Sequence, residues 1–237
     1  MIQNIKTRVE SLNWDSIQHE LDEQGFAKLP VILTKEECEF FKKLYCEEEP
    51  YRTTINMTRY RFGNGEYKYF SYPLPEIIQS LRESLYVELA KTANRWLGYL
   101  KKTEQFPDHL QDFLNTCVEY EQTRPTPLLL KYEKGGFNCL HRDLYGDIFF
   151  PFQVVFVLNQ REKDFCGGES LLVEQIPRAQ SRGHVITLEQ GSALIFPTNY
   201  RPVQGKKGYY KNTVRHGVST VTAGERYGLG IIFHDSK

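Results

Sequence analysis

The second half of the chain is divided into short apolar segments, and this pattern limits the folds that the chain can adopt. Stretches of six to nine residues rich in Val, Ile, Leu, Phe and Tyr alternate with Gly, Pro and Asn. Such spacing predicts β-strands joined by turns. Eight short strands within about 110 residues are typical of a sandwich or a barrel. The expected strands are 128–133, 137–142, 150–158, 169–175, 183–189, 192–197, 214–222 and 226–234.

Helical patterns dominate the first half of the chain. Thr34 and Glu37 are spaced as a capping box, in which each side chain bonds the backbone amide of the other, so a helix is expected from 35 to about 45. A hairpin is expected at 58–70, because Asn64 and Gly65 both accept positive φ. The other expected elements are a short strand at 26–30 and helices at 14–24, 75–97 and 108–121.

The boundary between the two patterns lies near residue 125. We expect a helical extension over 1–124, which carries a hairpin at 57–72, and a β-rich core over 125–237. The helices would pack against the outer face of one sheet, so the two parts are expected to form one compact unit.

Composition narrows the class of protein. Lys plus Arg equals Asp plus Glu at 30 each, so no overall charge attracts the chain to nucleic acid or to anionic membranes. The five cysteines are odd in number and widely spaced, which favours reduced thiols over a disulfide framework. No segment approaches the roughly 20 apolar residues of a membrane span, and the N-terminus lacks the apolar run of a signal peptide. We therefore expect a cytoplasmic protein.

Two polar residues after the second expected strand suggest a metal site. His141 and Asp143 are two positions apart, and on a strand such residues project to the same face. An imidazole nitrogen and a carboxylate oxygen suit non-haem iron(II), which is often held by two histidines and one carboxylate. His216 is the candidate third ligand, and Arg226 follows it by ten residues. The planar guanidinium of Arg226 can hold a carboxylate through two hydrogen bonds.

A His-x-Asp pair alone is usually a chance match, and Arg226 alone could be a surface ion-pair partner. The order His141-x-Asp143, His216 and Arg226, however, resembles the pattern of the iron(II)/2-oxoglutarate-dependent oxygenases. Tyr132 lies nine residues before His141, where many members have a tyrosine that contacts 2-oxoglutarate. FCGGESLL at 165–172 and GSALIF at 191–196 resemble segments of the prolyl-hydroxylase branch.

The resemblance implies a fold, a cofactor set and a reaction. The fold is mainly β with N-terminal helices, a double-stranded β-helix or jelly roll. His141, Asp143 and His216 would hold Fe(II), while Arg226 and Tyr132 would bind 2-oxoglutarate. With dioxygen as the oxidant, the enzyme would hydroxylate its substrate and release succinate and carbon dioxide. We expect the other strand histidines, His184 and His234, to have structural roles.

Two segments combine basic and aromatic residues in a way that suits a nucleic-acid strand, because cations meet phosphates and rings stack on bases. One is the expected hairpin at 57–72, and the other is the loop at 199–215 that leads directly into His216. An amphipathic hairpin with one buried face, or a solvated loop, would give the same patterns. The candidate substrate residues are Arg59, Tyr60, Arg61, Tyr67, Lys206, Lys207 and Lys211.

Five segments spread along the chain carry a second resemblance: RYRFGNGEYKYFSYPLP, TRPTPLLLKY, NCLHRDLYG, HGVS and LGIIFHD. Through them the chain resembles a bacterial family of 2-oxoglutarate oxygenases that act on nucleic acids and are loosely AlkB-like. That resemblance implies oxidative demethylation of damaged bases, with formaldehyde as the second product. Leu130 and Ile232 stand where AlkB has an asparagine and a second arginine, and the spacing of the core motif is nearer to that of prolyl hydroxylases. A protein hydroxylase acting on prolyl or other side chains is therefore the alternative. A non-catalytic binding module on this fold is a third hypothesis. The sequence leaves the choice between DNA and RNA and the oligomeric state open.

Overall fold

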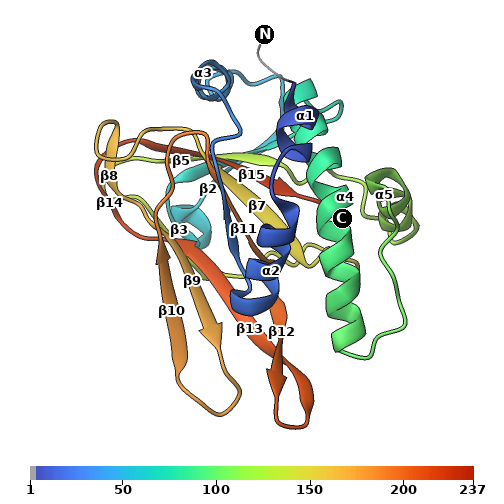
Figure 1. Cartoon of the computed structure of the whole chain (residues 1–237). Helices are drawn as coiled ribbons and strands as arrows, with labels where there is room; N and C mark the ends of the chain where they lie inside the picture. Colours follow the sequence, from blue (N-terminus) through green and yellow to red (C-terminus); the bar gives the residue numbers. More distant parts are fainter. Residues whose placement is uncertain (1–3) are drawn as a thin grey trace.

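The computed structural model describes residues 4–237, which form two facing antiparallel β-sheets with helices packed over one of them (Figure 1). The larger sheet consists, in spatial order, of β1 (Ala27–Leu29), β11 (Ala193–Pro197), β7 (Phe152–Val157), β15 (Arg226–Ile232), β5 (Leu128–Tyr132), β4 (Glu66–Phe70) and β2 (Tyr51–Asn56). Three of these strands come from the first half of the chain, so the sheet draws on residues both before and after position 125.

The smaller sheet contains the strands that carry most of the candidate metal ligands. Its spatial order is β10 (Ser181–Ile186), β9 (Ser170–Gln175), β13 (Gly208–Val218), β6 (Phe137–His141) and β3 (Gly63–Asn64), and β12 (Tyr200–Gly205) pairs with β13 beside it. A separate two-stranded ribbon joins β8 (Phe165–Gly167) to β14 (Val221–Gly224).

Four of the five helices agree closely with the sequence patterns, whereas α1 was not expected. Gly25 ends α2 in the left-handed conformation at φ 83° and donates its amide to Leu21. The capping box of α3 is present: the amide of Glu37 donates to the Thr34 hydroxyl at 3.2 Å, and the amide of Thr34 donates to the Glu37 carboxylate at 2.8 Å. No helix within 4–237 is both long and apolar enough to cross a membrane. The helices are α1 (Ile5–Glu10), α2 (Trp14–Gln24), α3 (Lys35–Leu44), α4 (Glu76–Tyr99) and α5 (Leu110–Glu119).

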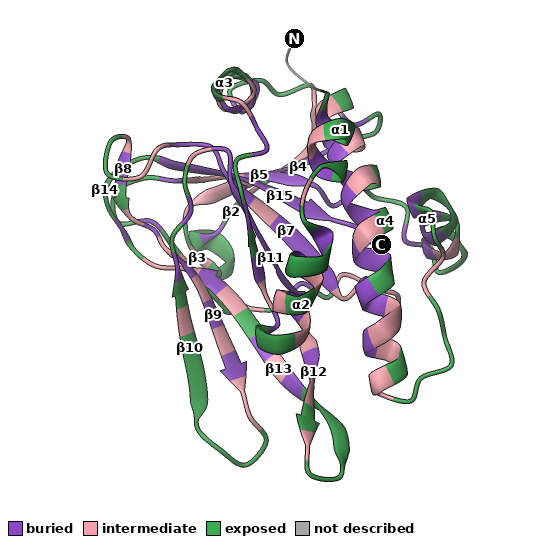
Figure 2. Cartoon of the chain, viewed as in Figure 1, coloured by how far each residue is buried: buried purple, intermediate pink, exposed green. Residues whose placement is uncertain are grey.

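The central strands of the larger sheet are buried on both faces (Figure 2). On β7, Phe152, Val154 and Phe156 pack into the core that contains the helices, whereas the intervening residues face the smaller sheet. On β15 the inner face carries Arg226 at one end and Ile232 at the other, with glycines at 228 and 230 between them. Because those glycines have no side chains, the space between the sheets stays partly open beside β15.

The hairpin expected around Asn64 and Gly65 does not form. Those residues join β3 to β4, which belong to different sheets: β3 pairs with β6, while β4 pairs with β2 and β5. Residues Thr58–Tyr60 form a 3-10 turn (η1) instead of a strand. A Cβ atom on Gly65 would lie 2.8 Å from the ring of Tyr132, so this glycine permits a close approach of two chain segments.

The expected loop at 199–215 is also corrected by the structure. It is a hairpin in which β12 pairs with the first part of β13, from Tyr200 opposite Thr213 to Gly205 opposite Gly208. Pro202 and the Gly-Lys-Lys-Gly run suggest a loop, but Pro202 lies on an edge strand, where a missing amide is tolerated. In Figure 1 this hairpin projects beyond the body of the protein beside the β9–β10 hairpin.

Candidate metal centre

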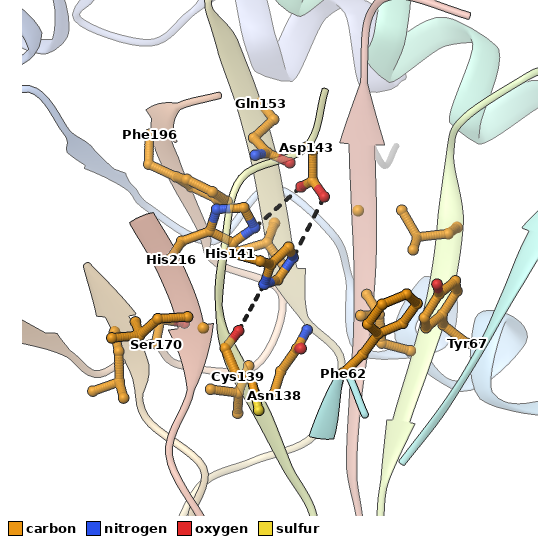
Figure 3. Close-up of a pocket in the computed structure, with 18 of the residues that line it drawn as sticks. Phe62, Tyr67, Asn138, Cys139, His141, Asp143, Gln153, Ser170, Phe196 and His216 are labelled. Carbon is orange, nitrogen blue, oxygen red and sulfur yellow. Dashed lines mark hydrogen bonds and ion pairs between the residues drawn. The ribbon is translucent and has the colours of Figure 1, made fainter. Parts of the chain in front are cut away.

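A cavity of about 390 Å³ lies between the two sheets, and the three predicted metal ligands share its wall. His141 ends β6 and His216 lies directly opposite it on β13, because these two residues are register partners. Asp143 is in the loop just after β6, so it reaches the site from this loop rather than from the strand that we expected. One ligand atom from each side chain lies within 4.8 Å of the others (Figure 3).

The distances are of the size expected for side chains that share one cation. The Nε2 atom of His216 is 3.1 Å from Oδ2 of Asp143, and Nε2 of His141 is 3.4 Å from Oδ1 of the same residue. Metal–ligand bonds of about 2.1 Å at right angles would place neighbouring donor atoms about 3 Å apart. The Nδ1 atom of His141 is 2.7 Å from the carbonyl oxygen of Cys139. With a proton on Nδ1 this contact is a hydrogen bond, which leaves Nε2 of His141 available for the metal.

The electrostatics of the cluster also suit a cation. Asp143 is 5% exposed, and this burial alone would raise its pKa. The charge of His216 and hydrogen bonds from both histidines outweigh the burial and hold the pKa of Asp143 well below its usual range. Burial lowers the pKa of His216. Burial also acts to lower the pKa of His141, but hydrogen bonding to Asp143 outweighs it and raises that pKa. The carboxylate is therefore ionised and ready to bind a metal ion.

Tyr145 orients the carboxylate. Its hydroxyl donates to Oδ1 of Asp143, and its ring meets that of Tyr69 edge-on at 6.2 Å. Burial and the charge of Asp143 raise the pKa of Tyr145, so the hydroxyl keeps its proton and remains a donor. We did not predict this residue, although its position two residues after Asp143 is a signal of the same kind as the His141–Asp143 spacing.

Replacing Tyr145 with phenylalanine is expected to weaken metal binding about 10- to 100-fold, because the change removes a hydrogen bond that fixes a ligand but keeps the ring. Titration with Fe(II) or Mn(II) without oxygen measures the effect. Tyr120→Phe, at an exposed tyrosine after α5, is the matched control. Equal metal affinity in both variants would show that Tyr145 does not hold the ligand in place.

Arg226 and Tyr132 also line the cavity. They are register partners on β15 and β5, and the Arg226 guanidinium carbon lies 5.7 Å from the centre of the Tyr132 ring. Arg226 is 1% exposed, and its Nε has no hydrogen-bond partner among residues 4–237. Burial lowers the pKa of Arg226, because this position is costly for a cation. A carboxylate entering the cavity would pair with the guanidinium, as the distal carboxylate of 2-oxoglutarate can.

The structure separates the predicted substrate residues into two groups. Arg61 and Tyr67 line the cavity, and the exposed Arg59 and Tyr60 lie in η1, which directly precedes Arg61 in the chain. Lys206 and Lys207 form the turn of the β12–β13 hairpin, and Lys211 lies 4.1 Å above the ring of Tyr200 on the same hairpin. The cavity wall includes none of these three lysines.

The two remaining strand histidines lie outside the metal cluster. His184 packs edge-on against Phe26 with 5.0 Å between ring centres. His234 is fully buried and lies behind Tyr145, with ring centres 6.1 Å apart. Neither belongs to the group of side chains that could share a cation in the described chain.

Gln153 is a second site residue that the sequence reading missed. It is 4% exposed on the inner face of β7, lines the cavity, and its Nε2 has no hydrogen-bond partner within residues 4–237. Figure 3 shows its amide on the same side of the cavity as Asp143. A polar side chain in the middle of the apolar segment 150–158 was the available signal, because such a residue needs a partner when buried.

Comparison with known proteins gives a consistent result. Residues 65–236 match the Oxygenase-NA family, described as "oxygenase, catalysing oxidative methylation of damaged DNA". The uncharacterized protein Rv2227 of Mycobacterium tuberculosis is 47% identical over 167 residues, which are 70% of this chain and 72% of that protein.

Solved structures resemble the chain in fold. A prolyl hydroxylase from Trichoplax adhaerens, in complex with a hypoxia inducible factor peptide fragment, has a TM-score of 0.58 at 14% identity and covers 98% of this chain and 92% of its own. A Pseudomonas putida prolyl-4-hydroxylase has a TM-score of 0.54 at 13% identity, and the match covers 94% of this chain and 99% of the hydroxylase. These likenesses confirm the predicted double-stranded β-helix.

Proposed function

This chain belongs to the Oxygenase-NA family, and from that premise we propose that it demethylates damaged nucleic-acid bases by oxidation. It is an oxygenase, and iron(II), 2-oxoglutarate and dioxygen fit the site. The observation that carries the proposal is the arrangement inside one cavity: a cluster of two histidines and one aspartate faces a buried arginine with an unpaired donor. The mouth of the same cavity is lined with aromatic and basic side chains.

When iron(II) and 2-oxoglutarate are bound, they supply an oxidant that inserts one atom of dioxygen into a substrate C–H bond, while 2-oxoglutarate becomes succinate and carbon dioxide. His141, Asp143 and His216 would hold the metal on one face and leave the cavity side open for ligands. Arg226 would pair with the distal carboxylate of 2-oxoglutarate, and the Tyr132 ring beside it would limit how that carboxylate can lie. Hydroxylation of an N-methyl group gives an N-hydroxymethyl group, which breaks down to the free base and formaldehyde.

The mouth of the cavity supports a flat, stackable substrate. Phe62 and Tyr67 line the cavity, and Figure 3 shows both rings across the cavity from His216. Phe62 is 48% exposed and stacks on Tyr60 with 5.6 Å between ring centres. Arg61 lies between these two residues in the chain and also borders the cavity. An exposed aromatic pair beside an arginine suits a base that has left its stack and the phosphate attached to it.

Protein side-chain hydroxylation is the second candidate function. The Trichoplax adhaerens structure that shares this fold is a prolyl hydroxylase in complex with a peptide fragment, so the fold is compatible with a peptide substrate. The third hypothesis, a binding module without activity, has the least support, because all three metal ligands and the buried arginine are present together.

A panel of substrates tests the proposal. The purified protein with Fe(II) and 2-oxoglutarate is given methylated single-stranded DNA, the corresponding duplex, methylated RNA and a proline-containing peptide library, with unmethylated strands as controls. We expect succinate and formaldehyde in equal amounts, and only with a methylated nucleic acid. Hydroxylated peptide without any formaldehyde from nucleic acid would instead establish the protein hydroxylase.

A further inference from the structure

Positive charge is concentrated on the two hairpins that project from the smaller sheet, β9–β10 (residues 170–186) and β12–β13 (residues 200–218). Although the chain has zero formal net charge, these two segments contain a single carboxylate, that of Glu174, and it is buried. Figure 2 shows the outer parts of both hairpins as exposed. Their exposed cations are Arg178, Arg182, Lys206, Lys207, Lys211 and Arg215.

A buried ionic network connects the two hairpins, while none of their exposed cations forms a salt bridge within residues 4–237. Glu174 on β9 accepts hydrogen bonds from Arg201 at 2.9 Å and from Asn212 at 2.7 Å. Arg201 also donates to the backbone carbonyl of Glu23 at the end of α2, at 3.2 Å. The single carboxylate is therefore used inside the protein to neutralise a buried arginine. The exposed lysines and arginines lie on ordered strands and turns with no acidic neighbour in either hairpin.

The hairpins are continuous with the metal centre. β13 pairs with β9 from Thr213 to Val218, and His216 lies within this paired stretch. Lys211 on β13 is five residues from His216, and Lys207, in the turn before β13, is nine residues away. At a rise of about 3.3 Å per residue these separations are about 17 and 30 Å. The exposed Arg142, at the edge of the cavity, donates to Asn199 at 2.9 Å, just before β12 begins. Basic side chains thus extend from the cavity edge along the β12–β13 hairpin.

A base held in the cavity cannot reach these lysines, but the strand attached to it can. At about 3.4 Å per nucleotide in a stacked strand, Lys211 and Lys207 would lie about five to nine nucleotides from the base at the metal. We propose that the two hairpins form a phosphate-binding arm, which holds the strand that flanks the base in the cavity. This inference rests on the proposed function, which makes the substrate a nucleic acid. It adds that the substrate is a strand several nucleotides long on one side of the damaged base.

The test compares long and short substrates in a triple variant, Lys206→Gln/Lys207→Gln/Lys211→Gln. For a methylated single strand of 30 nucleotides, we expect KM to rise about 10- to 100-fold near 0.1 M salt, because up to three phosphate contacts are lost. The slope of log affinity against log salt should become shallower by about 2. A methylated trinucleotide is too short to reach the lysines, so its KM should be the same in the triple variant as in the wild type. For each substrate, the kcat of the variant should also equal that of the wild type.

The matched control removes the same charge at the opposite end of the molecule in Figure 1. Lys6, Lys35 and Lys43 are exposed residues on α1 and α3, and all three are changed to Gln. The inference is overturned if this control weakens binding as much as the hairpin variant does, or if the hairpin variant handles the long strand like the wild type. Fluorescence anisotropy of a labelled, unmethylated 30-nucleotide strand measures binding to the arm and its salt dependence without any turnover. If no methylated nucleic acid is turned over, the proposed function fails. The salt dependence of the affinity measured by anisotropy still shows whether the hairpins bind phosphates.

Discussion

Replacing His216 with alanine is expected to lower metal affinity by more than about 100-fold and to remove turnover with it. The imidazole would supply one of three ligand atoms on a single face, and residues that only orient a ligand already contribute about 10- to 100-fold. His216 also faces Asp143 at 3.1 Å, so the variant leaves that buried carboxylate with one partner fewer. Both effects reduce the ability of the cluster to hold a cation.

The measurement is a titration with Fe(II) and 2-oxoglutarate in the absence of oxygen, followed by visible absorption of the metal–ligand complex. The wild type should develop an absorption band, and His216→Ala should not. His184→Ala is the matched control, since His184 is also a strand histidine but packs against Phe26 outside the cluster. Circular dichroism checks that both variants are folded. An unchanged band in His216→Ala would remove this residue from the ligand set.

The elements that the sequence predicted well are those determined by nearby residues. The bounds of α2 follow from Gly25, which ends the helix in a conformation that few other residues accept. The start of α3 follows from the reciprocal bonds of Thr34 and Glu37. The pairing of His141 with His216 could be anticipated only because the order of the motif resembles that of a known family. Nothing in the spacing of 75 residues between them requires the two strands to meet.

The errors arose where pairing between distant strands overrides a local turn signal. Asn64-Gly65 is a strong hairpin sequence, yet β4 gains two partners, β2 and β5, by joining the larger sheet. A strand paired on both sides satisfies more backbone groups than the short hairpin would. The β12–β13 hairpin was missed for the opposite reason, since its Gly, Pro and Lys residues look like a loop while its backbone pairs over six positions.

The buried residues of the site were only partly predictable. Arg226 was identified because it follows His216 by ten residues in the sequence. Gln153 and Tyr145, by contrast, are recognisable only when the fold places them in the cavity. Both are polar side chains in buried positions, which folded proteins tolerate when a partner is present. For Tyr145 that partner is Asp143, and for Gln153 the cavity itself leaves space for a ligand.

Arg226→Met is the second change with a large expected effect, and it acts on 2-oxoglutarate instead of the metal. Removing one partner of a buried charge pair costs about 2–5 kcal/mol, so the KM for 2-oxoglutarate should rise about 30- to 4,000-fold. Arg226→Lys keeps the charge but not the planar pair of donors, and we expect an intermediate value. Metal affinity in the absence of 2-oxoglutarate should remain that of the wild type in both variants.

Thermal unfolding separates this role from a structural one. Without 2-oxoglutarate, Arg226 is a buried cation whose Nε has no partner within 4–237, so Arg226→Met should be at least as stable as the wild type. With Mn(II) in place of iron, addition of 2-oxoglutarate should raise the Tm of the wild type, because the ligand binds only the folded state. The variant should show no such rise. A variant that unfolds early without ligand, or that 2-oxoglutarate still stabilises, would mean that Arg226 supports the fold and that the carboxylate binds elsewhere in the cavity.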